Sequence, residues 1–249
     1  MSQSVEAIQA AFKQLRLAEM SQALPQLLRQ AEKHSWTYME LLTEITDFEL
    51  KQREAKSIER RLKWAHFPYH KPLSSFDVSQ QSALSQRQLN QLATLNWVEQ
   101  QYNLILLGPP GVGKTALGVG LGLEAIQRGY QVIFITMGEL MHLLKTEEFT
   151  RKSQIHLKRI RSAGLVIIDD LMYLAMDSYE ANLFFQLVNH LYEQCSVILT
   201  SNKAPDQWSE LMGDQGITTA ILDRLLHRVE VIQMDGDSYR MKNKQKIFN

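Results

Sequence analysis

Apolar residues in the N-terminal part of the chain recur every three or four positions, which is the spacing of one helix face. The first stripe comprises Val5, Ile8, Phe12 and Leu15. Pro25 is expected to open a second, short helix, because proline suits a first helical turn. The capping-box pattern at 37–40 predicts a third helix, which runs to about Trp64 and is ended by Pro68 and Pro72. The pattern therefore predicts an all-α N-terminal region.

Beyond residue 96 the pattern changes to short runs that are apolar throughout, with helical stretches between them. Strands are expected at 103–107, 131–136, 165–169, 196–200 and 229–233. Helices are expected at 114–127, 138–145, 151–162, 178–193 and 217–227. Apolar strands that alternate with helices indicate a parallel sheet covered on both faces. We therefore expect a helical domain at 1–68 and an α/β domain at 69–249, in which 69–95 form a linker and lead-in.

Composition and charge narrow the class of protein. Of the 249 residues, 45% are hydrophobic and 22% are charged, which is typical of a globular chain. Cys195 is the only cysteine, which excludes an internal disulfide framework, and no apolar run approaches the ~20 residues that cross a bilayer. The N-terminus lacks a secretory pattern, so we expect a cytoplasmic protein with no membrane partner. The 27 basic and 27 acidic residues cancel, so any nucleic-acid binding must come from local basic patches.

One segment carries a complete chemical motif. Residues 108–115 match the phosphate-binding pattern G-x-x-x-x-G-K-[ST] at every position, between an expected strand and an expected helix. They are Gly108, Pro109, Pro110, Gly111, Val112, Gly113, Lys114 and Thr115. The backbone N–H groups of such a loop, together with the following helix N-terminus, attract phosphate. Lys114 is expected to contact the β- and γ-phosphates of ATP, and Thr115 to bind Mg²⁺.

Two further strands end in polar residues. Asp169 and Asp170 follow one buried strand, and Asn202 follows the next strand along the chain. In parallel sheets ligands bind at the carboxyl ends of the strands, so these side chains are expected to face the nucleotide. Asp169 would hold Mg²⁺ through water, and Asp170 would orient the attacking water. Asn202 would hydrogen-bond the γ-phosphate or that water.

Taken in order, these motifs resemble the AAA+ ATPases of the initiator and helicase-loader clade. Gly-Pro-Pro-Gly-Val-Gly-Lys-Thr, Val-Ile-Ile-Asp-Asp, Thr-Ser-Asn, Leu-Asp-Arg and the closing Asp-Ser-Tyr-Arg are most similar to the IstB-like ATP-binding proteins of insertion sequences, and DnaC helicase loaders are similar in the same places. The resemblance covers residues 70–245. It implies a P-loop AAA+ core with a five-stranded parallel sheet in the order 5-1-4-3-2 and no C-terminal lid. It also implies a homo-oligomer with ATP at the subunit interfaces, and DNA as a ligand.

The resemblance assigns roles to arginines as well. Arg224 matches the arginine finger that reaches the γ-phosphate bound by a neighbouring subunit. Arg228, four residues further on and expected to share its helix face, is the rival. Arg240 matches an arginine that senses the nucleotide. One departure from the family pattern is Asp170, which stands where glutamate is usual. Because aspartate is one methylene shorter, hydrolysis is expected to be slow.

Residues 151–161 carry five basic residues and no acidic one. Such a run is often only a solvated helix face, but in an ATPase that assembles on DNA we favour contacts with phosphates of any sequence. The expected contacts are Lys152, Lys158, Arg159 and Arg161.

The motifs together predict a function. We interpret the chain as an ATP-dependent, DNA-binding AAA+ accessory protein of transposition, which assembles on a target duplex and presents it to the cognate transposase. The N-terminal helical domain would dock a partner. The nearest alternative is a DnaC-like replicative helicase loader. A small-molecule P-loop kinase is disfavoured, because no acceptor pocket or arginine-rich lid is evident. A nucleotide-gated scaffold with negligible turnover is a further alternative, because of Asp170.

Overall fold

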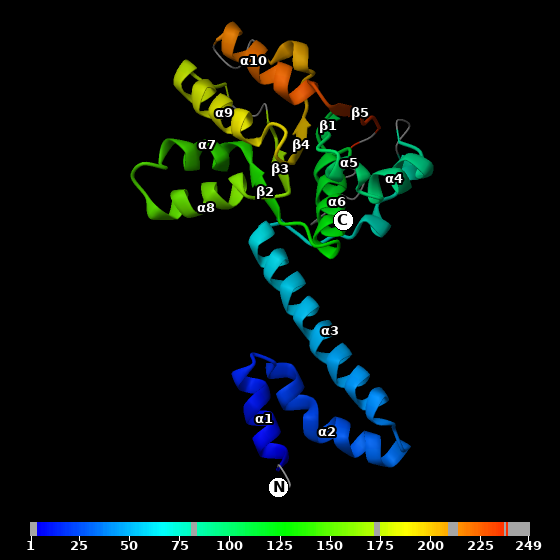
Figure 1. Ribbon diagram of the computed structural model, residues 1–249. Coiled ribbons are helices and arrows are strands. Elements are labelled where there is room, and N and C mark those ends of the chain that lie inside the picture. Colours follow the sequence, from blue (N-terminus) through cyan, green and yellow to red (C-terminus); the bar gives the residue numbers. More distant parts are fainter. Residues whose placement is uncertain (1–3, 81–83, 172–174, 209–213, 237, 239–249) are drawn as a thin grey trace, which may run out of the picture. The chain divides into compact units, whose positions relative to one another are not determined.

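The computed structural model describes residues 4–80, 84–171, 175–208, 214–236 and 238. The chain divides into two compact units, Met1–Arg60 and Arg61–Asn249, and helix α3 (Tyr38–Ala65) runs across the division. Figure 1 shows the helices of the first unit and the mixed helices and strands of the second. Within the described residues, no helix is both long enough and apolar enough to cross a membrane.

The first unit is built from helices alone. Helices α1 (Val5–Gln14) and α2 (Ala18–His34) precede α3. The core comprises the buried residues Leu24, Leu27 and Ile45, with Ile8 and Phe12 packed against them. The predicted apolar stripe on α1 is therefore confirmed at its centre, whereas Val5 and Leu15 at its ends are exposed.

The prediction that Pro25 opens a helix is wrong, because this proline lies inside α2. Proline has no backbone N–H, so the carbonyl of Ser21, four residues earlier, loses its helical donor. The side-chain amide of Gln9 on α1 replaces that donor, with Nε2 2.7 Å from the Ser21 oxygen. Ser21 is fully buried, and its hydroxyl donates in return to the Gln9 carbonyl oxygen at 2.9 Å. A tertiary contact thus lets the helix continue through the proline.

The start of α2 is capped by a residue of α3. Leu17, which precedes α2, provides no side-chain cap. Instead, the buried Glu49 carboxylate accepts the Met20 N–H at 2.8 Å and pairs with Arg53 Nε at 2.6 Å. Burial acts to raise the pKa of Glu49, but the hydrogen bonds outweigh it, and this pKa lies below its ordinary value. The carboxylate also offsets the positive end of the α2 dipole.

A five-stranded parallel sheet forms the centre of the second unit. Its strands are β1 (Asn103–Leu107), β2 (Val132–Thr136), β3 (Leu165–Asp169), β4 (Ser196–Ser201) and β5 (Val229–Gln233). Their spatial order is β2-β3-β4-β1-β5 and every neighbouring pair is parallel, which confirms the predicted order 5-1-4-3-2. Because β1 lies between β4 and β5, the loop that follows β1 leaves the sheet between two other strands.

Helices cover both faces of this sheet (Figure 1). They are α4 (Gln86–Ala93), α5 (Asn96–Glu99), α6 (Lys114–Gln127), α7 (Met137–Lys145), α8 (Arg151–Arg161), α9 (Ser178–Leu191) and α10 (Gln215–Leu226), with short 3₁₀ turns at Leu73–Ser75, Val78–Gln80 and Pro205–Gln207. Helix α6 lies against the face that carries Ile167 and Ile198. Helices α7, α9 and α10 share a buried core with the opposite face, which carries Val166 and Ile168. Helices α4 and α5 were not predicted, because they are too short for a periodic signal.

The segment after α3 packs along α6. A Cβ atom at Gly122 would lie 2.7 Å from the ring of Phe67, and one at Gly120 would lie 3.0 Å from Leu73. The missing side chains therefore permit the close approach of this segment. The segment is thereby fixed on the helix that follows the loop at 108–113.

We expect Gln9→Ala to destabilise the first unit by about 1–3 kcal/mol, because it leaves a buried carbonyl without a donor. Hydrogen exchange of the amides in α1 and α2 measures the loss. Gln14→Ala, at an exposed position of the same helix, is the matched control and should leave exchange unchanged. Adding Pro25→Ala to Gln9→Ala supplies a new backbone N–H for Ser21, so protection should return; continued fast exchange would contradict the account.

Candidate functional site

The loop between β1 and α6 has a backbone that only glycine adopts readily. Gly108, Gly111 and Gly113 have φ angles of 146°, 87° and 103°. A Cβ atom at Gly108 would lie 2.0 Å from the carbonyl oxygen of Met234, so a side chain has no room there. The neighbouring strands fix the start of the loop, because Gly108 N–H donates to the Ser201 oxygen at 3.2 Å. Such a loop, followed directly by a helix N-terminus, directs N–H groups toward an anion.

Lys114, the first residue of α6, places its charge at this loop. Its side chain is buried, and its Nζ donates to the carbonyl oxygens of Gly108 at 2.6 Å and Pro109 at 2.9 Å. The ammonium group is therefore held among loop carbonyls, within the part of the site where phosphate oxygens would lie.

Asp169, the last residue of β3, accepts hydrogen bonds from two hydroxyl groups. Thr115 Oγ1 lies 3.0 and 3.1 Å from its two carboxylate oxygens, and Thr200 Oγ1 lies 2.6 Å from Oδ1. Burial raises the pKa of Asp169, the nearby Asp170 adds to this rise, and the two hydroxyls and Lys114 oppose it. The structure thus brings together the two predicted Mg²⁺ ligands, Thr115 and Asp169.

Asp170 differs from its neighbour in backbone and exposure. Its φ angle is 55°, which is uncommon for a residue with a side chain and costs free energy. The Asp170 N–H donates to Thr200 Oγ1 at 2.9 Å, which holds this conformation. The side chain is exposed at the same sheet edge as the loop, where water reaches it.

Asn202 follows β4 directly and is exposed. Strand β4 lies between β3 and β1, so Asn202 lies at the sheet edge where Asp169 and the phosphate-binding loop also lie. The turn beyond it is fixed, because the buried Trp208 donates its ring N–H to the Lys203 carbonyl oxygen at 3.0 Å. Arg240, predicted to sense the nucleotide, lies outside the described residues.

Some residues of this site were not predicted as such. Thr200 is fully buried and its hydroxyl contacts both Asp169 and Asp170, and its signal was a hydroxyl residue two positions before Asn202. Met234 approaches Gly108, and a Cβ atom at Gly113 would lie 3.3 Å from the ring of Phe76. These two contacts come from segments far away in the sequence, so no local pattern could reveal them.

The two candidate finger arginines lie at the other end of the sheet, where the strands begin. The N–H of Asn103, the first residue of β1, donates to the Arg228 carbonyl oxygen at 2.7 Å, and Asn103 Nδ2 donates to the Leu225 oxygen at 3.0 Å. The end of α10 therefore lies where β1 begins, whereas the phosphate-binding loop follows the end of β1. The five residues of β1 separate these ends by roughly 16 Å.

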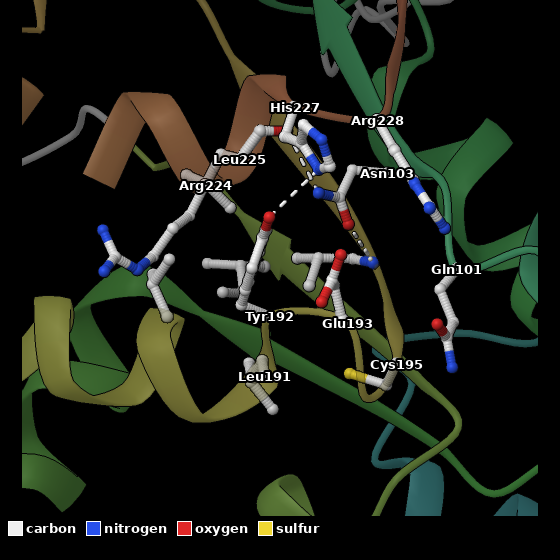
Figure 2. A pocket seen from close by; sticks show the side chains of 13 residues that line it. Gln101, Asn103, Leu191, Tyr192, Glu193, Cys195, Arg224, Leu225, His227 and Arg228 are labelled. Atoms are coloured by element: carbon white, nitrogen blue, oxygen red, sulfur yellow. Dashed lines mark hydrogen bonds between the residues drawn. The ribbon is translucent and has the colours of Figure 1, made fainter. Parts of the chain in front are cut away.

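Arg224 and Arg228 do not share a helix face, so that expectation is wrong. Helix α10 ends at Leu226, and Arg228 lies beyond it, directly before β5. Figure 2 shows the two side chains on opposite sides of a pocket whose wall includes the hydrogen bond between Tyr192 and His227. Arg224 is half-buried, whereas Arg228 is exposed and makes one long hydrogen bond, 3.5 Å from Nη1 to the Gln100 oxygen.

The predicted DNA contacts on α8 fall into two pairs. Arg161 forms two hydrogen bonds with Glu147, at 2.5 and 2.8 Å, and Arg159 lies 4.9 Å from the ring centroid of Trp64. Lys152 and Lys158 are exposed, and among the described residues neither has an ion-pair partner. The two lysines are therefore more available to a ligand than the two arginines.

The residues at the loop fit ATP and Mg²⁺. The three glycines leave room for phosphate against the backbone, and the Thr115–Asp169 pair offers a hydroxyl and a carboxylate, which are oxygen ligands suited to Mg²⁺. Gly108, Pro109, Pro110, Gly111, Val112, Gly113, Lys114 and Thr115 would surround the phosphates.

Comparisons with known proteins bear on this site. A family described as IstB-like ATP binding protein matches residues 10–247. A protein named as an ATP-binding protein of insertion sequence IS21, from Pseudomonas aeruginosa, is 38% identical over 239 residues, which cover 96% of this chain and 90% of that protein.

Solved structures match about two thirds of the chain. The crystal structure of DnaI has a TM-score of 0.54 and 21% identity, and the match covers 68% of this chain and 90% of that one. The replication initiator DnaA, bound to AMPPCP and single-stranded DNA, has a TM-score of 0.53 and 22% identity over 71% of this chain and 54% of that one. These likenesses confirm the predicted P-loop AAA+ fold.

We expect Asp169→Asn to stabilise the nucleotide-free protein, because asparagine keeps acceptors for the two threonine hydroxyls and removes a buried charge. Since burial raises the pKa of Asp169, ionisation of this carboxyl disfavours folding above that pKa, and the penalty disappears as the pH falls through it. The melting temperature should rise by about 2–4 °C at pH 8, the shift that about 1 kcal/mol produces in a chain of this size.

The rise in melting temperature caused by Asp169→Asn should become smaller at acidic pH. Asp170→Asn, one residue away and exposed, is the control and should change the melting temperature less. A gain that is equal at all pH values, or a lower melting temperature for Asp169→Asn, would refute this role of burial.

Proposed function

This chain belongs to the IstB-like ATP-binding proteins of insertion sequences, and from that premise we propose that it is an ATPase that assembles on duplex DNA and presents that duplex to a transposase. The observation that carries the ATPase part is the contact of Thr115 with Asp169 at the end of the phosphate-binding loop. It supports joint binding of one metal ion beside the phosphates.

Each polar residue of the site has a part in hydrolysis. Lys114 neutralises charge on the β- and γ-phosphates. Mg²⁺, when bound by Thr115 and Asp169, supplies further neutralisation of the phosphate oxygens. Asp170 accepts a hydrogen bond from the attacking water, and Asn202 hydrogen-bonds the γ-phosphate. The water oxygen then bonds to the γ-phosphorus while the bond from this phosphorus to the bridging oxygen breaks, and the proton lost by the water passes to an oxygen of the released phosphate, which gives ADP and inorganic phosphate. The short Asp170 side chain makes this step slow.

The site is completed by a neighbouring subunit in this proposal. Arg224 lies near the sheet edge opposite its own phosphate-binding loop, and β1 separates the two edges by roughly 16 Å. Its guanidinium is therefore placed to serve an ATP bound by another copy of the chain. The protein would thus form a homo-oligomer with ATP at each interface, and hydrolysis would depend on assembly.

Duplex DNA is the proposed ligand of the assembly. Lys152 and Lys158 are exposed on α8, a helix with no acidic residue, and supply charge for phosphates of any sequence. Arg159 and Arg161 follow Lys158 on the same helix, although Trp64 and Glu147 already contact these two side chains. The structurally similar DnaA has been solved with single-stranded DNA, which supports a nucleic-acid ligand for this fold.

The proposed partner of the assembly is the cognate transposase. Relatives from insertion sequences support it, and we assign the helical region 1–68 to docking. The likeness to the DnaC helicase loader, at a TM-score of 0.50 and 19% identity, is the basis of the alternative, in which the partner is a replicative helicase. Co-purification with purified transposase and with purified helicase separates the two: retention of the helicase alone would favour the loader.

We expect Lys114→Ala to abolish ATP binding and Arg224→Ala to retain binding but lose turnover, by roughly 10³-fold or more if the residue is an arginine finger. Equilibrium binding of a fluorescent ATP analogue and steady-state phosphate release measure the two effects. Mixing the variants should restore part of the activity, because one supplies Arg224 and the other supplies a competent loop. Full activity of Arg224→Ala would indicate that Arg228, and not Arg224, is the arginine finger.

For DNA, we expect the affinity of the ATP-bound protein for a duplex to fall with salt, with a log–log slope of about −0.9 for each phosphate contacted. The double variant Lys152→Ala, Lys158→Ala should flatten that slope and weaken all duplex sequences alike. Lys33→Ala removes an exposed charge from the first unit and is the control. Equal slopes for the wild type and the double variant would show that α8 is only a solvated face.

A further inference from the structure

Two residues of α9 hold the side chain of Arg224. Arg224 Nε donates to Asn189 Oδ1 at 2.9 Å, and the guanidinium carbon lies 4.9 Å from the ring centroid of Phe185. A third contact comes from its own helix, where Nη1 donates to the Ala220 carbonyl oxygen at 2.9 Å. Phe185 and Asn189 are four residues apart on α9, so they present a ring and an acceptor on one face of that helix.

These contacts leave part of the guanidinium available. Arginine has five N–H donors, and the contacts named above use one on Nε and one on Nη1. Among the described residues, none accepts a hydrogen bond from Nη2, which keeps two donors next to the ring of Phe185. A planar group of this kind binds two phosphate oxygens at once when its orientation is fixed.

Helix α9 itself is firmly anchored, so it can act as a support. Phe184, Leu187, Val188 and Leu191 are buried in the core. Its first turn carries Glu180, which caps the helix and pairs with Lys145 of α7 at 2.7 Å. Phe185 and Asn189 therefore project from a rigid element, which keeps a long and otherwise mobile side chain in one conformation.

We propose that Asn189 and Phe185 are positioning residues that orient Arg224 toward the γ-phosphate of ATP bound by a neighbouring subunit. The inference rests on the proposed function, in which Arg224 acts between subunits. Orientation before reaction matters because a charge that is already in place stabilises the transition state without reorganisation. Within the described part of the chain, the Arg228 side chain has no comparable support, since the hydrogen bond that it makes is the 3.5 Å one to the Gln100 oxygen.

The test is a double-mutant cycle on ATP hydrolysis by the full-length protein. Asn189→Ala should lower kcat by roughly 10- to 100-fold, the effect of one hydrogen bond to a charged group, and leave KM for ATP nearly unchanged. In an Arg224→Ala background, Asn189→Ala should cause no further loss, because Asn189 acts only through that arginine. Asn182→Ala, the same residue type at an exposed position of α9, is the control and should behave as the wild type.

A second pair of variants tests the ring. Phe185→Tyr keeps the aromatic face and should retain turnover, whereas Phe185→Leu keeps apolar volume without the face and should lower kcat. Melting temperatures check that each variant is folded. Mixing Asn189→Ala with Lys114→Ala chains should restore activity, because Lys114→Ala subunits supply a correctly held Arg224. A merely misfolded subunit would not be rescued.

The outcomes separate this inference from the function on which it rests. Wild-type turnover of Arg224→Ala would overturn the assignment of Arg224 itself. A large loss for Arg224→Ala with wild-type turnover for both Asn189→Ala and Phe185→Leu would overturn the positioning role alone. Losses of Asn189→Ala and Arg224→Ala that multiply in the double variant would also overturn it, because they would show independent action.

Discussion

The buried carboxylate of Asp169 is the constraint on which the rest of the site depends. A charge at the end of a buried strand is unfavourable unless polar groups surround it, and Thr115, Thr200 and Lys114 offset part of that cost here. These partners come from two other segments, because Lys114 and Thr115 begin α6 and Thr200 lies on β4. The hydrogen bonds to this one carboxylate therefore join α6, the helix after the phosphate-binding loop, to β3 and β4. They also fix the positions of the groups that would contact phosphate and metal.

Because the sheet is parallel, the residues at the beginning of its strands differ from those at their end. All five strands point the same way, so Asp169, Asn202 and the phosphate-binding loop lie at one edge. Helix α10 ends at the other edge, beside the start of β1, and carries Arg224 with it. The proposed ATP site and Arg224 thus lie at opposite ends of the strands of one subunit. In the proposed oligomer these edges meet between copies, and α9 fixes the orientation of the arginine that crosses the interface.

The features that local sequence determines were predicted well. The strands and the phosphate-binding loop follow from apolar runs and from a motif of eight positions, whereas the strand order was implied only by the family resemblance. Features that depend on distant contacts were not. Helix α2 continues through Pro25 only because Gln9 of another helix replaces the missing donor. Arg161 pairs with Glu147 only because α7 and α8 lie side by side. Arg228 lies outside α10 because this helix ends two residues before it.

In the proposed oligomer, Arg224 of one subunit completes the ATP site of the next. Electron microscopy of the protein assembled with AMPPCP, Mg²⁺ and duplex DNA tests it most directly. We expect density for the γ-phosphate between the phosphate-binding loop of one subunit and the Arg224 guanidinium of its neighbour, with Asn189 still hydrogen-bonded to that arginine. An assembly in which only residues of the loop's own chain contact the γ-phosphate would contradict it.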